Sequence, residues 1–233
     1  MSSLVGASDV PTIANIAFVS DVYRFAFCFG ANEIGSSALD PMLIRWSDQE
    51  DVANWTPEAT NQAGSLRLSK GTEIIAAKQA RQEILVVTDA AVYGLQYLGA
   101  PAVWGAQLVG ENTTIISPNA MIYSNNVAYW MGTDKFYYYD GTVKTLPCSV
   151  RSYVFDDINK QQFDQVVAVR GGNRVVTKVG VKPRRTAQRA VVPRLLNVVI
   201  DHVAVVFIRA KQAMYLPATT NGRRPAACCV TAR

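Results

Sequence analysis

The chain has 233 residues, 49% of them hydrophobic, which is enough apolar material for one or two domains with a buried core. Its net charge of +5 conceals a division: residues 1–168 carry 10 Lys+Arg and 17 Asp+Glu, a net of −7, while residues 169–233 carry 13 and 1, a net of +12. The longest apolar stretch, residues 195–208, is interrupted by Asp201-His202 and is too short to span a membrane, so no membrane span is expected.

Residues 1–12 form a lead-in without the basic and apolar regions of a signal peptide, so we expect synthesis in a cytoplasm. Residues 13–30 predict two strands around a turn at Ser20-Asp21. Four aromatic residues alternate with smaller or polar ones in this stretch, which places them on one face of a strand: Tyr23, Phe25, Phe27 and Phe29.

Residues 42–46 predict a further strand, which completes a first meander over residues 13–57. Asp48 follows it and is expected to start a turn in which its carboxylate accepts hydrogen bonds from the next main-chain amides. Trp55 precedes Thr56-Pro57 and is expected to anchor the end of that loop.

Residues 58–71 read as a long connection, and a second meander is expected over residues 72–109. Its clearest strands are residues 83–87 and 91–97, followed by a turn at residues 99–101, where Gly and Pro are typical turn residues.

The strongest β signal lies in residues 119–146, which are rich in Tyr, Trp, Phe and Val. Two dipeptides of the kind that favours two-residue hairpin turns lie in it: Asn125-Asn126 between its first and second segments, and Asp140-Gly141 between its third and fourth. The pattern predicts four short strands, at residues 120–124, 127–132, 135–139 and 142–146.

A weaker copy of this segment lies 45 residues upstream, with Tyr93 matching Tyr138 and Ile84 matching Tyr129. A repeat of about 40–50 residues, each one a small antiparallel meander, is typical of β-propeller blades. Residues 148–159 are expected to start another blade, with residues 165–169 as its next strand.

The predicted fold is therefore all-β, with antiparallel four-stranded meanders over residues 13–168 as the blades of an incomplete β-propeller. Closed propellers need about four to eight blades, and this stretch holds three and a piece of a fourth. Residues 169–233 are expected to be an irregular basic tail.

Several pieces of residues 4–168 resemble a family of tailed-phage virion structural proteins, the tail nozzle or tail tubular (phage stabilisation) proteins of short-tailed phages. The signature residues that carry the resemblance are Arg45, Trp46, Ser47, Asp48, Trp55, Trp130, Tyr139, Asp140 and Gly141. The resemblance implies a structural role for them in a propeller-containing subunit that is repeated around the tail axis of the virion, through which double-stranded DNA passes. The partners it implies are other copies of the chain and other tail proteins.

The resemblance stops near Val169, and in the family the start of this sequence looks like an internal segment, so Met1 is a candidate internal start. Residues 169–233 have many Arg and Val and few aromatic residues, as a translated shifted frame of a GC-rich gene has. A frameshift is the favoured interpretation. A basic tail that binds nucleic acid by releasing counterions from phosphates, and an unusual folded domain, stay open.

Little in the chain points to catalysis, cofactors or metals, and we expect none of them. The single histidine, His202, lies in the basic tail, and the adjacent acids Glu50-Asp51 and Asp156-Asp157 are typical of solvated loop ends. Gly171-Gly172 lacks the residues of a phosphate-binding loop. The cysteines, read as free thiols, show neither metal spacing nor a disulfide framework: Cys28, Cys148, Cys228 and Cys229.

Two alternatives to a structural virion protein remain. One is a binding module that presents loops to a protein or glycan partner, for which the Tyr137-Tyr138-Tyr139 run offers rings for stacking. The other is a tail-associated hydrolase, which requires two carboxyl groups that converge in space. Core packing is the preferred interpretation of the tyrosine run.

Overall fold

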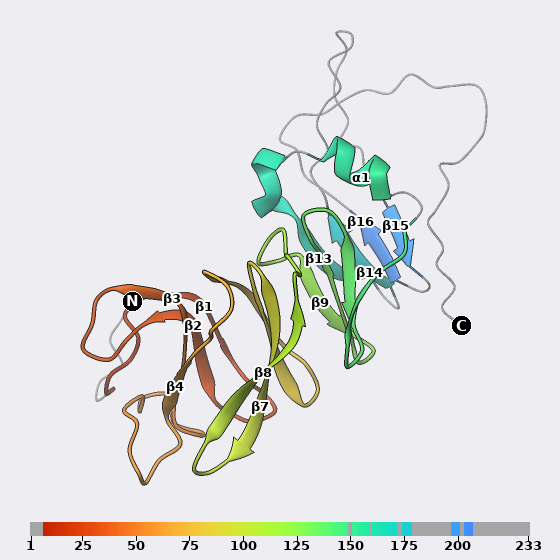
Figure 1. Ribbon diagram of the computed structural model, residues 1–233. Helices are drawn as coiled ribbons and strands as arrows, with labels where there is room; N and C mark the ends of the chain where they lie inside the picture. Colours follow the sequence, from red (N-terminus) through yellow and green to blue (C-terminus); the bar gives the residue numbers. More distant parts are fainter. Residues whose placement is uncertain are drawn as a thin grey trace, which may run out of the picture. The chain divides into compact units, whose positions relative to one another are not determined.

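The computed structural model describes residues 7–148, 151–158, 160–171, 174–178, 197–200 and 203–206. Within these residues the chain is mostly β, and three sheets are four-stranded antiparallel meanders (Figure 1). The chain divides into two compact units, Met1–Thr114 and Ile115–Arg233. The prediction of consecutive four-stranded meanders is therefore confirmed.

The first unit contains two of these sheets, each with its strands in sequence order. The first sheet consists of β1 (Ala14–Val19), β2 (Ala26–Asn32), β3 (Leu39–Trp46) and β4 (Gly64–Arg67). The second consists of β5 (Ile74–Gln79), β6 (Glu83–Thr88), β7 (Ala91–Gly99) and β8 (Val103–Glu111). The prediction that residues 58–71 are only a connection is wrong, because the short segment GSLR within them forms β4 and pairs with β3.

The hydrophobic core of the first unit is built from alternate residues of both sheets. The predicted aromatic strand face is confirmed for Phe27 and Phe29 of β2, whereas Phe25 and Tyr23 lie in the connection before β2. Phe25 is nevertheless buried in that core, and Tyr23 packs against it. The other sheet contributes Tyr93 and further alternate positions of β6 and β7. Full burial of each such side chain contributes about 1.5–3 kcal/mol, so this shared face is the main stabilising feature of the unit.

The predicted turn at Ser20-Asp21 is present as a four-residue connection between Ser20 and Phe25. The Ser20 hydroxyl accepts a hydrogen bond from the Tyr23 amide at 3.2 Å, and the Ser20 carbonyl accepts one from the Arg24 amide at 2.8 Å. These two bonds stabilise the turn and fix the position of Tyr23 within it.

The third sheet lies in the second unit and consists of β9 (Met121–Ser124), β10 (Val127–Met131), β11 (Phe136–Tyr139) and β12 (Val143–Thr145). Asn125 and Asn126 have φ of 54° and 63°, the values that a two-residue primed turn requires, so that prediction is confirmed. The second predicted turn is wrong in length. Tyr139 pairs with Val143, which leaves three residues in the connection, and only Gly141 among them has positive φ, at 110°.

Three strands of the second sheet, β5–β7, repeat in register as β9–β11 of the third, but the period is 44 residues and not the predicted 45, and the fourth strands do not follow it. Ala77 pairs with Val86 in one sheet, and the residues 44 positions later, Met121 and Trp130, pair in the other. A shift of one residue moves a strand position to the opposite face. Tyr93 is therefore equivalent to Tyr137, which is buried, and not to Tyr138.

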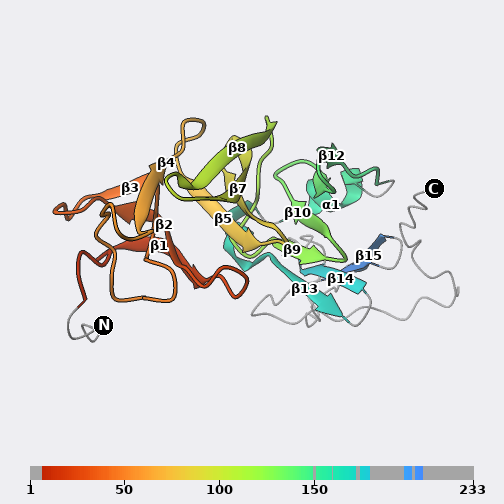
Figure 2. The ribbon, with the colours of Figure 1, turned by 90° about the horizontal axis from the view of Figure 1, so that it is seen from below.

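Residues 148–159, expected to begin another meander, contain instead the helix α1 (Arg151–Asp157). Val154 and Ile158 are both 2% exposed, and their spacing of four residues is that of one helical face. Phe155 contacts Phe136 of β11 with ring centroids 5.2 Å apart, which places α1 against the third sheet (Figure 2). The 3-10 helix η1 (Lys160–Gln165) follows.

The predicted strand at residues 165–169 is confirmed as β13 (Val167–Gly171), which pairs with β14 (Arg174–Lys178). A second pair follows, with β15 (Asn197–Ile200) and β16 (Val203–Val206). The described parts of residues 169–233 are thus hairpin strands and not irregular chain. The remainder of the predicted tail lies outside the described residues, as do His202, Gly172, Cys228 and Cys229.

Candidate functional site

The signature residues of the first unit form the base of the long connection between β3 and β4, residues 47–63. Ser47 is fully buried, and its hydroxyl accepts a hydrogen bond from the Ala26 amide at 3.1 Å. Asp48 accepts one from the Gln49 amide at 2.8 Å, as the sequence predicted, and another from the distant Gln62 amide at 2.8 Å. The carboxylate of Asp48 therefore holds the start and the end of the connection together.

Gln62 links this base to the second sheet of the same unit. Its main-chain carbonyl accepts a hydrogen bond from the indole Nε1 of Trp46 at 2.9 Å. Its side-chain oxygen accepts one from the hydroxyl of Tyr97, in β7, at 2.8 Å. Gln62 is thus fixed through both its main chain and its side chain.

Arg45 lies on the other side of β3 and is 2% exposed. Its guanidinium donates to the main-chain carbonyl of Asn32 at 3.2 Å and to that of Asp9 at 2.5 Å. Burial lowers the pKa of Arg45, with the Asp9 carboxylate acting in the opposite direction. Burial also raises the pKa of the neighbouring Cys28 thiol to about 11. Arg45 therefore ties the N-terminal segment to the first sheet.

Trp55 is 5% exposed, and its indole donates to the Val52 carbonyl at 2.8 Å, so the expected anchor of the loop is present. The chain around it forms a parallel bridge with the N-terminal segment: the Trp55 amide donates to Ser8, and the Ser8 amide donates to Ala53. The signature residues of the first unit thus serve a structural role.

Tyr23 joins its own turn to two other connections at this end of the first unit. Its hydroxyl donates to the Gln82 carbonyl in the β5–β6 turn at 3.1 Å, and its carbonyl accepts from the Gln49 side chain at 3.2 Å. Its ring contacts Tyr97 and lies edge-on to Trp104, with centroids 5.3 and 5.1 Å away. We call this surface the Tyr23 end, and define it as the connections 20–25, 47–63, 80–82 and 100–102 with the adjoining strand residues Val19 and Leu98.

The Tyr23 end combines exposed aliphatic side chains with negative charge. Among the described residues, nine large hydrophobic side chains are exposed, and the four most exposed all belong to it: Val19 (61%), Leu98 (61%), Val22 (50%) and Val52 (47%). Its four connections contain five acidic residues and two basic ones, a net charge of −3. All four aliphatic residues lie at the same end of the unit, although Val19 and Leu98 point to the outer faces of different sheets, and exposed aliphatic residues at the end of a hydrogen-bonded scaffold can serve as contacts for another protein.

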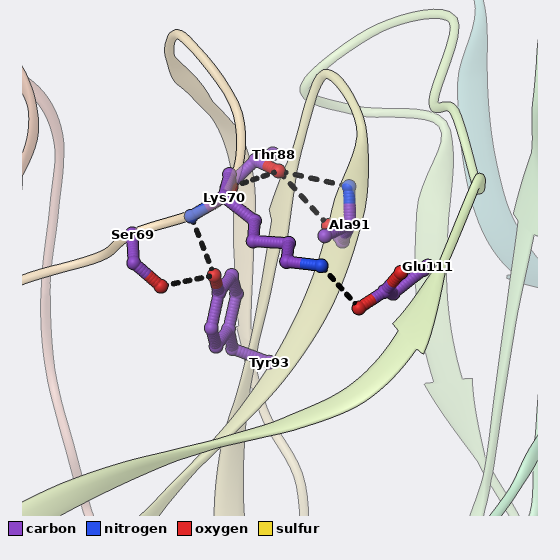
Figure 3. Close-up of polar contacts among 6 residues, drawn as sticks. All are labelled: Ser69, Lys70, Thr88, Ala91, Tyr93 and Glu111. Atoms are coloured by element: carbon purple, nitrogen blue, oxygen red, sulfur yellow. Dashed lines mark hydrogen bonds and ion pairs between the residues drawn. The ribbon is translucent and has the colours of Figure 1, made fainter.

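The opposite end of the second sheet carries a polar cluster that satisfies buried groups (Figure 3). The Tyr93 hydroxyl accepts from the Lys70 amide at 2.8 Å, and the fully buried Thr88 hydroxyl accepts from the Ala91 amide at 2.9 Å. Lys70 also pairs with Glu111 at 2.5 Å, but both side chains are about half exposed. These contacts close the β6–β7 turn and point to a structural role.

The signature residues of the second unit do not form a common site with a reactive group. Trp130 is 2% exposed and stacks on Tyr137, with ring centroids 5.6 Å apart. Tyr139 is also buried, and Gly141 closes the hairpin. Asp140 is exposed, and its hydrogen bonds with Lys144 hold the pKa of that carboxyl below its ordinary value.

The predicted tyrosine run is divided between the two faces of its sheet. Tyr137 and Tyr139 are buried, which confirms core packing for them, and Tyr138 lies half-buried on the other face. There it pairs with Tyr129 of β10, with ring centroids 6.4 Å apart, and the Lys144 ammonium lies 5.6 Å from the centre of its ring.

The adjacent acids show no catalytic arrangement. Glu50 pairs with Arg24 at the exposed Tyr23 end, and Asp156 lies exposed in α1. Among the carboxyl groups of the described residues, three have a pKa that departs from the ordinary value, and in all three it is lowered: Asp40, Asp89 and Asp140. Among the described residues, no group of three His, Cys, Asp or Glu side chains is placed to hold a metal ion.

Sequence reasoning found the signature residues but missed the Tyr23 end as a surface. Tyr23 was expected only as one of four aromatic residues on a strand face, and Gln62 and Gln82 carry no local signal because their partners are distant in sequence. The one usable signal in the sequence was an aliphatic residue beside a tyrosine near a turn, at Val22-Tyr23 and Tyr97-Leu98, and both tyrosines pack against the core.

No helix within the described parts of the chain is both long and apolar enough to cross a membrane. No protein-family model matches the chain. A search of curated proteins likewise finds no match to it.

Proposed function

We propose that this chain is a structural subunit of a phage tail nozzle or hub, which works by assembling with other copies and with other tail proteins into a conduit for the genome. The observation that carries the proposal is the Tyr23 end, where four connections form one hydrogen-bonded surface with exposed aliphatic residues. Such a surface fits a protein whose role is contact with other proteins. The resemblance of residues 4–168 to tail proteins supplies the biological setting, the virion tail, with synthesis in the host cytoplasm.

The three four-stranded sheets are proposed to be blades of an incomplete β-propeller. The shared 44-residue register of β5–β7 with β9–β11 supports this, because blades repeat one supersecondary unit. Three blades do not close a ring. Other polypeptide, from a second copy or another tail protein, is then needed to cover the sheets that remain open.

The acidic balance of residues 1–168, a net charge of −7, supports a wall along which DNA passes without binding. Clustered Lys and Arg would bind phosphates by releasing counterions, and would slow the passage. Double-stranded DNA is therefore proposed as a passing cargo, and nucleic-acid binding by the basic residues 169–233 as a separate and less favoured property.

The test is the assembly state of the purified full chain, measured by analytical ultracentrifugation and by negative-stain electron microscopy. Rings, arcs or tubes that form in a concentration-dependent manner are the expected result. A chain that stays monomeric at every concentration reached would overturn the structural proposal and leave the stand-alone binding module in its place.

That binding module is the second candidate, because the same exposed residues could receive an unrelated protein. The half-buried Tyr129–Tyr138 pair is the corresponding feature for a glycan, since aromatic rings stack on the apolar faces of sugars. The tail-associated hydrolase is the weakest candidate. A catalytic acid of that class needs a raised carboxyl pKa, and the shifts found here are in the opposite direction.

A further inference from the structure

We infer that the Tyr23 end is the docking surface for the basic C-terminal segment, residues 169–233, of a second copy of this chain. The inference rests on the proposed function, because both require the chain to self-associate, and it goes further by naming the two surfaces that meet. The contact is head-to-tail, so that one surface of each copy meets a different surface of the next.

The first argument is the position of the exposed aliphatic residues. Val22 follows the Ser20-Asp21 turn and precedes Tyr23, and Leu98 follows Tyr97, while the rings of Tyr23 and Tyr97 are 5.3 Å apart. Each aliphatic residue is thus a sequence neighbour of one of two tyrosines whose rings are in contact, and Leu98 lies on the outer face of its sheet because Tyr97 packs on the core side. At 50% and 61% exposure the two aliphatic side chains present apolar surface that a partner can cover.

The second argument is that the surface is held rigidly. Hydrogen bonds from Tyr23, Tyr97 and Asp48 connect three of its four connections to one another or to the sheet below. The fourth is tied in by the contact of Trp104 with the Tyr23 ring. Side chains on such a scaffold lose little conformational freedom when a partner binds, which favours association.

The third argument is charge complementarity. The connections of the Tyr23 end carry five acidic and two basic residues, and one of the two bases, Arg24, is already paired with Glu50. Residues 169–233 carry 13 basic residues, one acidic residue and 13 valines among 65 positions. Eight of these valines lie in the paired strands β13–β16, so the segment offers positive charge with five further valines, and it is the charge that matches this surface.

The decisive experiment compares two charge-reversal variants of the full chain that change the net charge equally. The variant Asp21→Lys/Glu58→Lys reverses two exposed acids of the Tyr23 end. The matched control Glu33→Lys/Glu73→Lys reverses two exposed acids in the connections at the opposite end of the same unit. Self-association of each is measured by sedimentation velocity over a range of concentrations.

We expect the Tyr23-end variant to associate on the order of tenfold more weakly than the unmodified chain, and the control to associate as the unmodified chain does. Raising the salt concentration to about 1 M, where the screening length falls to about 3 Å, should weaken association of the unmodified chain in the same way. An equal effect of both variants would overturn the inference, because it would show a response to net charge alone.

Partner charge reversal provides the complementary test. Arg184→Glu/Arg185→Glu in the basic segment should also weaken association, and mixing this variant with the Tyr23-end variant should restore it, because every mixed contact joins either two unmodified surfaces or two reversed ones. No restoration would overturn the assigned pairing. Release of the assembly by a short DNA duplex, with no effect of the Tyr23-end variant, would identify nucleic acid as the ligand of the basic segment instead.

The aliphatic residues are tested separately with Val22→Ser/Leu98→Ser against Ile34→Ser/Leu108→Ser, where the control pair is also exposed. Weaker association of the first variant alone is expected. If the unmodified chain does not associate at all, the proposed function itself fails. If it associates but neither Tyr23-end variant changes that association, only the present inference fails.

Discussion

The Tyr23 hydroxyl donates a hydrogen bond to the Gln82 carbonyl at 3.1 Å, and so joins turns that belong to two different sheets. The ring of the same residue lies edge-on to Trp104. One side chain therefore contributes both a polar and an aromatic link to the Tyr23 end, and the two contributions can be separated by substitution.

Tyr23→Phe keeps the ring contacts and removes the hydrogen bond, so it should lower the free energy of unfolding by about 1 kcal/mol or less. Tyr23→Ala removes the ring as well and should cost on the order of 2–3 kcal/mol. Urea denaturation followed by tryptophan fluorescence measures both. Equal costs for the two variants would contradict a packing role for the ring.

Gly64 lies against the ring of Trp46, because a Cβ added there would be 2.7 Å from Cζ2 of the indole. Gly64→Ala should therefore destabilise the first unit by about 1–3 kcal/mol. In a Trp46→Phe background, the same substitution should cost less, since the smaller ring leaves room. A double-mutant cycle by urea denaturation measures this coupling, and Ser65→Ala, at an exposed neighbour, serves as the control.

A substitution at Gly141 changes the preferred backbone conformation without a steric clash, since its φ is 110° and no atom would lie within 4 Å of an added Cβ. Gly141→Ala should destabilise the third sheet by about 1–2 kcal/mol because L-residues rarely adopt this conformation. Thermal denaturation monitored by circular dichroism provides the measurement. Lys144→Ala, which removes an exposed ion pair in the same hairpin, should change stability by less than about 1 kcal/mol.

Arg45→Lys should destabilise the chain by about 2–3 kcal/mol, although it keeps the positive charge. The guanidinium donates to two separate main-chain carbonyls, and an ammonium on a differently shaped side chain leaves one of them without its donor. Arg67→Lys, at the exposed pair with Asp40, is the matched control and should cost less than about 1 kcal/mol. Comparable losses at both sites, measured by urea denaturation, would argue against the N-terminal tie.

Cys28 should react slowly with iodoacetamide at neutral pH, because burial raises its pKa to about 11 and the thiolate is the reactive form. The rate should rise steeply as the pH approaches 11. The folded state holds this proton more tightly than the unfolded state, so the associated stability is complete below about pH 9 and is lost between pH 9 and 11. Mass spectrometry of the Cys28 peptide, with a urea-unfolded sample as the control, measures the rate.

The sequence allowed prediction of most strands, because alternation of aromatic and small residues is a local signal. It placed β6, β7 and β9–β12 within a residue or two of their observed bounds, whereas β2 begins only at Ala26, after the turn that holds Tyr23. It missed β4, whose four residues show no such alternation. Residues 148–159 were misassigned because Tyr153, Val154 and Phe155 are typical strand residues, while the spacing of Val154 and Ile158 was the better guide.

The candidate site was less accessible to prediction for a physical reason. Its scaffold depends on hydrogen bonds between residues far apart in the chain, such as Tyr97 with Gln62 and Tyr23 with Gln82. Local patterns indicate which residues form strands, but they do not specify which turns meet. The period was misjudged by one residue for a related reason, since tyrosine stands at both positions 137 and 138 and only pairing separates them.

Strands β5–β7 and strands β9–β11 pair in the same register, and this has a practical consequence for protein engineering. Residues 77–93 and 121–137 have the same length and the same internal pairing, so either stretch can replace the other without inserting or deleting a residue. A chimera with two copies of one stretch keeps every main-chain hydrogen bond of the hairpins and changes only the side chains. It would thus separate what the main-chain pattern specifies from what each set of side chains adds.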